Sequence, residues 1–278
     1  MLQNIKSVLI GMTEEGIDEP SAALSYGISL AEKAGAHATI QAASLKVVLG
    51  TTFVNSMGAN LVAAHNKRLR EFAAAVGERA RGDAAAAGVA ASVETPQLAY
   101  GQLVEVFVAQ AMVHDVAIVD SETATINADR GLIEALLFES GRPLIVVPEH
   151  CDTFKGGRII VAWDASARAA RAVNDAMAFL KAAEAVEILA VGTEKELAKS
   201  IPGAELAPHL ARHGVNVTVK NLVVQNSIAD TIAEQVELFG ADMLVMGAFN
   251  HSLMREWVLG GVTESMLKES KVPLFLSY

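Results

Sequence analysis

Glycines near the end of the chain have a spacing that suits the binding of a phosphate group. Residues 246–263 read MGAFNHSLMREWVLGGVT, with Gly247 at the start of the loop and Gly260 and Gly261 at its end. A glycine lets backbone N–H groups approach a phosphate because no Cβ stands in the way, and the start of a helix adds a partial positive charge. The loop is therefore a candidate phosphate cradle. A structural turn is the alternative, because glycine spacing alone has low specificity.

The other side chains of this loop bear on the same choice. Asn250 tolerates a left-handed backbone better than other non-glycine residues do. Arg255 is the one arginine or lysine in the loop, and Glu256 follows it. His251 is either a phosphate contact or an exposed loop histidine. The hydroxyl of Thr263 is a further donor to a phosphate.

An internal repeat shows which elements must position this loop. At the start of each copy, SVLIGMT (7–13) matches RIIVAWD (158–164) at an offset of 151. In the middle, DVAIVD (115–120) matches DMLVMG (242–247) at an offset of 127. At the end, GLIEALLFESGRPLIVVP (131–148) matches GVTESMLKESKVPLFLSY (261–278) at an offset of 130. We therefore expect two copies of one domain, residues 1–148 and 158–278, joined by a polar linker at 149–157. The first copy has 24 extra residues (151 minus 127) in its middle.

Short apolar runs alternate with helical patterns in each copy, which predicts an α/β fold with two repeated, doubly wound, five-stranded parallel sheets flanked by helices. In the second copy we expect strands at Ile159–Trp163, Val186–Val191, Val215–Val224, Met243–Met246 and Leu274–Leu276. We expect helices at Ala167–Lys181, Ala204–His213, Ile228–Phe239 and Trp257–Glu269. The first copy has a longer second helix near Asn60–Ala87, which accounts for its extra residues.

Several of these features resemble the universal stress protein family. They are the order of five strands, Asp164 at the end of the first strand of the second copy, and a loop that reads Gly247, two residues, Asn250, nine residues, Gly260, Gly261. The nucleotide-binding branch of that family has glycine, two residues, glycine, nine residues, glycine, then serine or threonine. Here Asn250 replaces the second glycine, and Gly261 replaces the hydroxyl residue. The resemblance covers nearly the whole chain and implies tandem domains with the strand order 3-2-1-4-5.

The resemblance also implies where a nucleotide would bind. In that strand order, ligands settle at the carboxyl ends of the strands between strands one and four, where Asp164 and the glycine loop converge. Asp164 and Val191 would border the adenine and the ribose. The remaining implied contacts, to the ribose and the phosphates, are Gly247, Asn250, Gly260, Gly261, Val262 and Thr263. The implied ligand is ATP, with Mg²⁺ as its companion ion.

The first copy departs from this pattern. Thr13 stands where the second copy has its aspartate, and the loop DSETATINADRG is three residues shorter (130 minus 127). That loop carries Asp120, Glu122 and Asp129, three carboxylates that would repel a triphosphate, and Arg130 does not offset them. We expect the first copy to be degenerate for nucleotide.

Other residues with metal-binding or ring-stacking chemistry have plainer interpretations. His209 and His213 are four residues apart, as two ligands of one metal can be, but no third ligand is near them. The side chains of 150–152, in the linker, are adjacent in sequence and rarely converge on one ion. Trp163 either stacks on a base or caps the core, and Trp257 packs the loop onto its helix. No metal site is expected.

Composition limits the classes of function. The chain has 278 residues and a net charge of -10, and it has no basic cluster of the kind that binds nucleic acid. No apolar run has the length and flanks of a signal peptide or a membrane span, so we expect a cytoplasmic protein without a membrane partner. Cys151 is the one cysteine, which excludes an internal disulfide.

These observations predict a stress-response protein that binds or senses adenine nucleotide through its second domain. A regulatory role is favoured over an enzymatic one, because no general base, placed metal or GxxxxGK[ST] loop is visible. Two alternatives stay open: a dimerisation module of the same fold that holds no nucleotide, and a slow ATPase. The final strands, 144–147 and 274–276, are candidates for apolar edges of the sheet. The resemblance implies that they pair across a pseudo-twofold axis as an intramolecular dimer, and a homodimer of whole chains is a further expectation.

Overall fold

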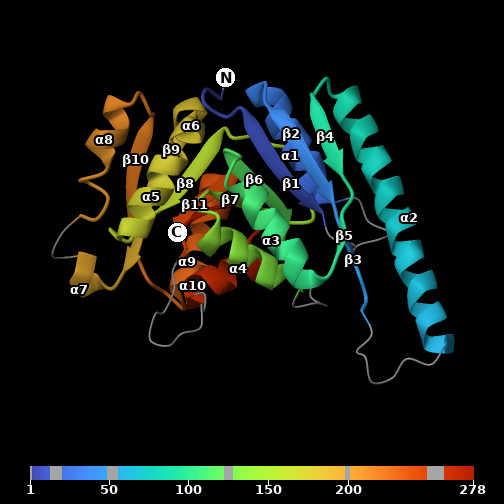
Figure 1. Ribbon diagram of the computed structural model, residues 1–278. Coiled ribbons are helices and arrows are strands. Elements are labelled where there is room, and N and C mark those ends of the chain that lie inside the picture. Colours follow the sequence, from blue (N-terminus) through green and yellow to red (C-terminus); the bar gives the residue numbers. More distant parts are fainter. Residues whose placement is uncertain (1, 13–20, 49–55, 122–127, 198–200, 249–259) are drawn as a thin grey trace.

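A single ten-stranded sheet runs through the whole computed structural model, which describes residues 2–12, 21–48, 56–121, 128–197, 201–248 and 260–278 (Figure 1). The strand order is β10-β9-β8-β11-β12-β7-β6-β1-β2-β4. Each half therefore contributes five parallel strands in the order 3-2-1-4-5, as the sequence predicts. A separate two-stranded sheet, β3-β5, lies in the first half.

The elements of the two halves follow the alternation expected from the sequence. The first half contains β1 (Ser7–Met12), α1 (Ala22–Ala34), β2 (His37–Ala42), β3 (Ser44–Leu45), α2 (Ser56–Ala86), β4 (Ala91–Glu94), β5 (Gln97–Leu98), α3 (Tyr100–Ala111), β6 (Val116–Asp120), α4 (Ala128–Glu139) and β7 (Leu144–Val147). The second half contains β8 (Arg158–Ala162), α5 (Ala167–Asp175), α6 (Met177–Ala182), β9 (Ala185–Gly192), α7 (Glu194–Leu197), α8 (Ala207–Arg212), β10 (Val217–Val223), α9 (Ile228–Phe239), β11 (Met243–Gly247), α10 (Gly261–Glu269) and β12 (Leu274–Ser277).

The two halves meet at the last strand of each. β12 pairs with β7 in antiparallel fashion, with Leu274 opposite Val146 and Leu276 opposite Leu144. Every other strand pair of the large sheet is parallel. This confirms the predicted pairing of the final strands across a pseudo-twofold axis, and it makes the two five-stranded sheets one continuous sheet.

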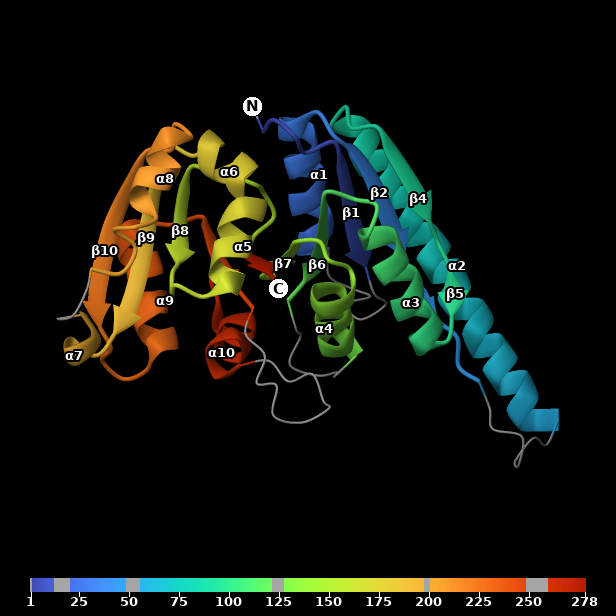
Figure 2. The same ribbon diagram turned by 60° about the vertical axis from the view of Figure 1, so that its left-hand side comes forward.

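Helices cover both faces of the sheet and give three layers (Figure 2). One buried apolar cluster contains side chains of α1, α2, α5, α6 and α8, and the other contains side chains of α3, α4, α9 and α10. Each cluster includes residues of both halves. Strands that are buried on both faces read as continuous apolar runs, and β7 (LIVV) is an example because all four of its residues are buried.

Some predicted boundaries are wrong. The helix expected at Ala167–Lys181 is interrupted at Ala176, which ends α5 and precedes α6. Alanine favours helix on both sides of that position, so the sequence carries no signal for the break. The helix expected from Ala204 begins at Ala207, and the short elements α7, β3 and β5 were not expected. The expected start of the last helix at Trp257 lies outside the described residues.

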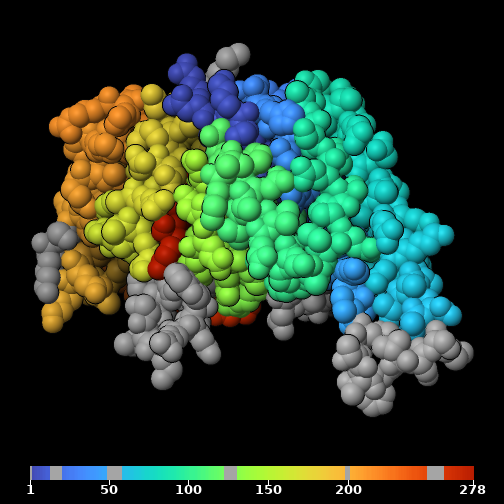
Figure 3. All heavy atoms as spheres, in the orientation of Figure 1, coloured from blue at the N-terminus to red at the C-terminus, as the bar shows by residue number. Residues whose placement is uncertain are grey.

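The described extra residues of the first half, chiefly in α2, lie at one end of the molecule. The helix α2 has 31 residues and packs beside the edge strand β4, at the opposite end of the molecule from α8 and β10 (Figures 1 and 3). The Asn66 amide anchors this helix to the end of β3, because its side chain both accepts from Val47 N and donates to Val47 O, at 2.9 Å each. The insertion therefore lies far from the carboxyl-end crevice of the second half.

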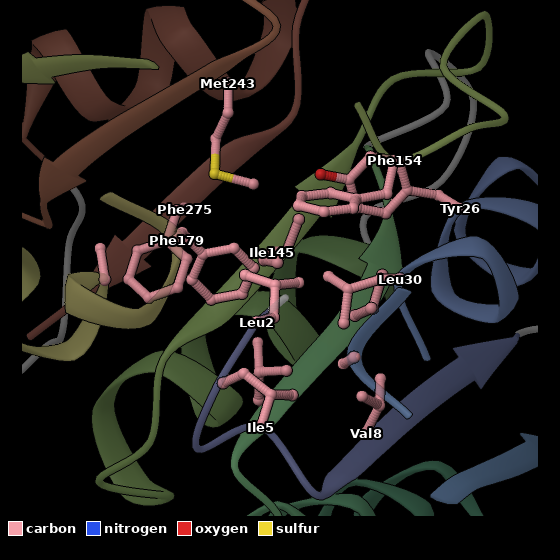
Figure 4. Close-up of a cluster of buried hydrophobic side chains, with 14 of the residues drawn as sticks. Leu2, Ile5, Val8, Tyr26, Leu30, Ile145, Phe154, Phe179, Met243 and Phe275 are labelled. Atoms are coloured by element: carbon pink, nitrogen blue, oxygen red, sulfur yellow. The ribbon is translucent and has the colours of Figure 1, made fainter. Parts of the chain in front are cut away.

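The segment between the halves is fixed in the core. Its Phe154 side chain is 4 % exposed and lies between Tyr26 of α1 and Phe179 of α6, at ring-centre distances of 5.7 and 5.9 Å (Figure 4). Phe179 in turn contacts Phe275 of β12 at 5.4 Å. These edge-on aromatic contacts join three parts of the chain across the junction, and they hold residues 149–157 as part of the folded body.

Candidate functional site

A pocket of about 320 Å³ opens at the carboxyl ends of strands β8, β9 and β11. In the sheet, β8 lies between β9 and β11, and this is the place where the winding of the chain reverses direction. Ligands of doubly wound sheets bind at such a switch point. Its lining is Ala162, Trp163, Asp164, Leu189, Val191, Ile228, Ile232, Met246, Gly247, Gly260, Gly261, Val262 and Thr263.

The structure brings together seven of the eight residues that the resemblance assigns to a nucleotide. They come from the end of β8, the end of β9, the end of β11 and the first turn of α10: Asp164, Val191, Gly247, Gly260, Gly261, Val262 and Thr263. The eighth, Asn250, lies outside the described residues, as do His251, Arg255, Glu256 and Trp257. Contact of these residues with a nucleotide stays a prediction.

Asp164 is held in a fixed turn at the mouth of the pocket. Its Oδ1 accepts a hydrogen bond from Ser166 N at 2.9 Å, and the Ser166 hydroxyl accepts one from Ala169 N at 3.1 Å, which caps α5. Ala165 between them has φ 59°, a left-handed conformation that costs a non-glycine residue about 1–2 kcal/mol. The turn therefore orients an exposed carboxylate at the pocket rim.

Gly247 is required by packing whether or not a ligand binds. A Cβ at this position would lie 2.6 Å from Ala169 N and 2.6 Å from the carbonyl carbon of Arg168. The first turn of α5 therefore packs directly on the backbone at the end of β11. This glycine is explained by the close approach of two backbone segments, so its presence is no argument for a phosphate.

Gly261 is different, because no atom of the described residues lies within 4 Å of the place where its Cβ would be. Gly260 is the N-cap of α10, with φ -66° and ψ 151°, and none of the described side chains caps this helix. The first N–H groups of a helix have no partner within the helix, and together they carry a partial positive charge. Because Gly260, Gly261 and Val262 line the pocket, this end of the cavity suits an anion.

Trp163 forms part of the wall and is fixed by a hydrogen bond. Its Nε1 donates to Glu205 Oε1 at 2.8 Å. A backbone N–H at Glu205 and the Trp163 indole N–H hold the pKa of the Glu205 carboxyl below its ordinary value. Two roles are expected for Trp163, and the structure confirms that it packs against the core. It also lines the pocket, and stacking on a ligand stays a prediction.

Sequence reasoning missed the apolar walls of the pocket. Leu189, Ile232 and Met246 are 1 %, 4 % and 5 % exposed, and Ile228 is 41 % exposed at the rim. All of them belong to apolar patterns that predict ordinary core packing, so the sequence carries no sign that they also face a cavity. Their arrangement between a carboxylate and a helix N-terminus suits a flat, largely apolar ring system that carries a negatively charged group.

The corresponding place in the first half contains different groups. Asp120, at the end of β6, holds the position of Gly247 (offset 127). Its carboxylate accepts hydrogen bonds from Ala23 N and from the Ser21 hydroxyl, both at 2.7 Å, at the start of α1. The predicted acidic residue is thus engaged in capping a helix. Glu122 and Thr13 lie outside the described residues.

Two aromatic side chains of the first half also lie against glycines at the corresponding places. Tyr100 and Ile228 are the first residues of two helices with the same place in the fold, α3 and α9. The Tyr100 hydroxyl lies 2.3 Å from the place where a Cβ of Gly131 would be, whereas the counterpart Gly261 (offset 130) faces open space. Phe107 packs on Gly11 in the same manner, with its Cε1 2.5 Å from a Cβ built there.

The remaining sequence candidates show no convergence on a ligand. The rings of His209 and His213 contact each other at 4.8 Å on and just after α8. In the part of the chain that the structure describes, no group of three or more His, Cys, Asp or Glu side chains could hold a metal ion. No helix among the described residues is both long and apolar enough to cross a membrane.

The fold and the pocket define a class of protein: a doubly wound α/β protein of two repeats, with a ligand crevice at the switch point of the second. Residues 156–277 match the model of the universal stress protein family. This match covers the second half of the chain and confirms the resemblance to that family seen in its residues.

Solved structures show the same fold over the whole length of the chain. A universal stress protein from Archaeoglobus fulgidus DSM 4304 is 18 % identical, with a TM-score of 0.70 and coverage of 98 % of this chain and 97 % of the other. A functionally unknown protein from Pseudomonas aeruginosa PAO1 is 15 % identical, with a TM-score of 0.57 and coverage of 99 % and 93 %. A search of curated proteins finds no match.

Proposed function

We propose that this chain is a cytoplasmic stress-response protein that binds adenine nucleotide in the pocket of its second half. In this proposal the two halves, residues 1–148 and 158–278, are domains with separate tasks. The second binds the ligand, and the first provides the partner surface for the shared sheet. Binding would stabilise one state of the molecule over another, which is how a ligand acts as a switch.

One observation carries the proposal. Three features meet in the pocket: the Asp164 carboxylate after the end of β8, an apolar slot, and the uncapped N-terminus of α10. In the proposed complex, the Asp164 carboxylate accepts hydrogen bonds from the ribose, the walls around Val191 enclose the base, and the N–H groups of Gly261 and Val262 receive the phosphates. The volume of about 320 Å³ is within the range of small-molecule sites.

Mg²⁺ has a supporting place in this proposal. It would be held chiefly by the phosphates of ATP, because the ion retains several waters and is bound in such sites through few protein carboxylates. A regulatory role is favoured over hydrolysis, since the described pocket lining offers Asp164 as its only carboxylate and includes no histidine or lysine.

The first test is to find the ligand directly. The purified protein is denatured, and the released small molecules are identified by chromatography and mass; protein that is isolated empty is titrated with ATP, AMP and adenosine, with and without magnesium. We expect ATP to bind and to raise the melting temperature. An empty protein that shows no binding at millimolar ATP and magnesium would contradict the proposal and favour the dimerisation module.

A conservative variant locates the site. Asp164→Asn keeps an oxygen that can accept from Ser166 N but removes the charge, so we expect an unchanged fold and about tenfold weaker binding of both ATP and adenosine. Asp152→Asn, in the exposed part of the linker, is the matched control and should bind as the unmodified chain does. Equal affinities for all three proteins would place the nucleotide elsewhere.

A further inference from the structure

Arg130 of the first half reaches across the junction between the two halves. It lies in α4, and its guanidinium makes two ion pairs: Nε with Glu134 Oε1 at 3.1 Å and Nη1 with Glu264 Oε1 at 3.2 Å. Glu134 and Glu264 are counterparts in the repeat (264 minus 134 is the offset of 130). One arginine is thus shared by two carboxylates that the pseudo-twofold axis relates.

The far partner of this arginine belongs to the helix that lines the pocket. Glu264 directly follows Thr263 in α10, and its N–H bonds to the carbonyl of Gly260. Four residues of helix rise by about 6 Å, so the carboxylate-bearing residue is one turn from the uncapped N-terminus. Figure 2 shows α4 and α10 on either side of the junction, at the same edge of the sheet. Arg130 therefore contacts the helix whose first residues line the pocket.

Glu264 has a second cationic partner besides Arg130. Lys268 Nζ lies 2.9 Å from Glu264 Oε1, one helical turn further along α10. The pKa of the Glu264 carboxyl lies below its ordinary value, first because of Lys268 and second because of Arg130. If Arg130 left Glu264, Lys268 would remain as the counter-ion of Glu264, so this carboxylate would still be paired.

The pocket itself lacks a cation among the residues that the structure describes. Among the described lining residues, the only ionisable side chain is the carboxyl group of Asp164. A helix N-terminus stabilises an anion by a modest amount, and a guanidinium gives stronger, paired hydrogen bonds to phosphate oxygens. Arg130 is 24 % exposed, so its charge is less screened by water than that of a fully exposed side chain.

We propose that Arg130 determines the preference of the second-half pocket for phosphorylated ligands, by turning from Glu264 to the outer phosphates of a nucleotide bound at the start of α10. Glu264 acts as its counter-ion in the empty protein. This inference rests on the proposed function, because it names the group that reads the phosphates at that site. It also gives the first half a direct part in a site that its own fold no longer forms.

The test compares ATP with adenosine, which shares the base and ribose but has no phosphate. Arg130→Gln should weaken ATP binding about tenfold and leave adenosine binding unchanged. Glu264→Gln removes the competing carboxylate and should strengthen ATP binding by a few fold, again without an effect on adenosine. Arg142→Gln is the matched control, since this exposed arginine of the same half donates a hydrogen bond to Met112 O, within the first half.

Opposite changes in the two variants exclude a merely structural role, because loss of an ion pair alone would shift both variants in the same direction. Melting temperatures show whether each variant folds, and Glu264→Gln decides the matter if Arg130→Gln does not fold. If the unmodified chain binds neither ATP nor adenosine, the proposed function fails and this inference with it. If it binds both and the ratio of their affinities is the same in all variants, only the inference about Arg130 is overturned.

Discussion

The two halves of this protein have the same strand order, yet different side chains lie at the carboxyl ends of the strands. In the second half, Ile228 and Gly261 border a cavity. In the first half, the residues at those places are Tyr100 and Gly131, and the tyrosine hydroxyl lies against the glycine. In the proposed account, these few side chains, and not the backbone fold, decide which half binds a ligand.

The residues at the ends of β6 and β11 contact the starts of two corresponding helices, α1 and α5, in different ways. Asp120 provides a carboxylate that caps α1, while Gly247 lets the backbone of α5 approach directly. A carboxylate at this point faces the place where phosphates would lie in the other half, and it is already neutralised by N–H groups. In the first half, the residue at the place of Gly247 therefore serves as a helix cap.

The largest expected effect comes from placing in the second-half pocket the tyrosine that stands at the matching place in the first half. Ile228→Tyr should bring a hydroxyl to Gly261 as Tyr100 brings one to Gly131, and we expect ATP affinity to fall about 100-fold, or about 2.7 kcal/mol. Stability should change little, because Ile228 is 41 % exposed and Tyr100 is 40 % exposed at its own position. Calorimetric titration and a melting curve measure the two quantities.

The matched control for this variant is Tyr100→Ile, in the half that is expected to bind nothing. It should leave ATP binding as it is in the unmodified chain. Undiminished ATP affinity in Ile228→Tyr would show that the nucleotide does not enter the cavity between α9 and α10, and it would remove the basis of the comparison.

A second pair of variants tests the two ways of starting a helix. Gly247→Ala should destabilise the ligand-free protein by about 1–3 kcal/mol, since its Cβ would lie 2.6 Å from a backbone nitrogen. Asp120→Ala should cost about 1–2 kcal/mol through the loss of a charged helix cap. Urea unfolding without nucleotide measures both changes. An unaltered free energy of unfolding in Gly247→Ala would mean that the glycine serves only a ligand.

The smallest effect is expected at Gly261. Gly261→Ser restores the hydroxyl of the family pattern at a position where a Cβ meets nothing within 4 Å, so we expect ATP to bind a few fold more tightly, a gain of about 1 kcal/mol. Gly82→Ser in α2, where a Cβ also meets nothing within 4 Å, is the control for the general effect of serine on a helix. Weaker ATP binding in Gly261→Ser alone would show that the backbone itself must approach the ligand there.

Much of the fold follows from patterns that the chain repeats. The ends of the repeat predict two copies of one domain, and buried parallel strands read as apolar runs. The resemblance implies the strand order in each half and the pairing of 144–147 with 274–276. The glycines and Asp164 predict the location of the crevice, because strand ends in a doubly wound sheet have fixed neighbours.

Other features depend on contacts that no local pattern reveals. Phe154 stands in a polar segment that reads as a loose linker, and only the packing of Tyr26 and Phe179 around it shows that the segment belongs to the core. Tyr100 reads as an ordinary first residue of a helix, and the approach of its hydroxyl to Gly131 is visible only in three dimensions. The sequence relates Arg130 only to its own half, because it does not show that α4 faces α10.

The central claim is that one half of the chain binds a nucleotide and the other has lost the ability. Isothermal titration of the ligand-free protein with ATP and magnesium tests this most directly, because it counts the sites. We expect one molecule of ATP per chain. Two molecules per chain, or none, would contradict the account.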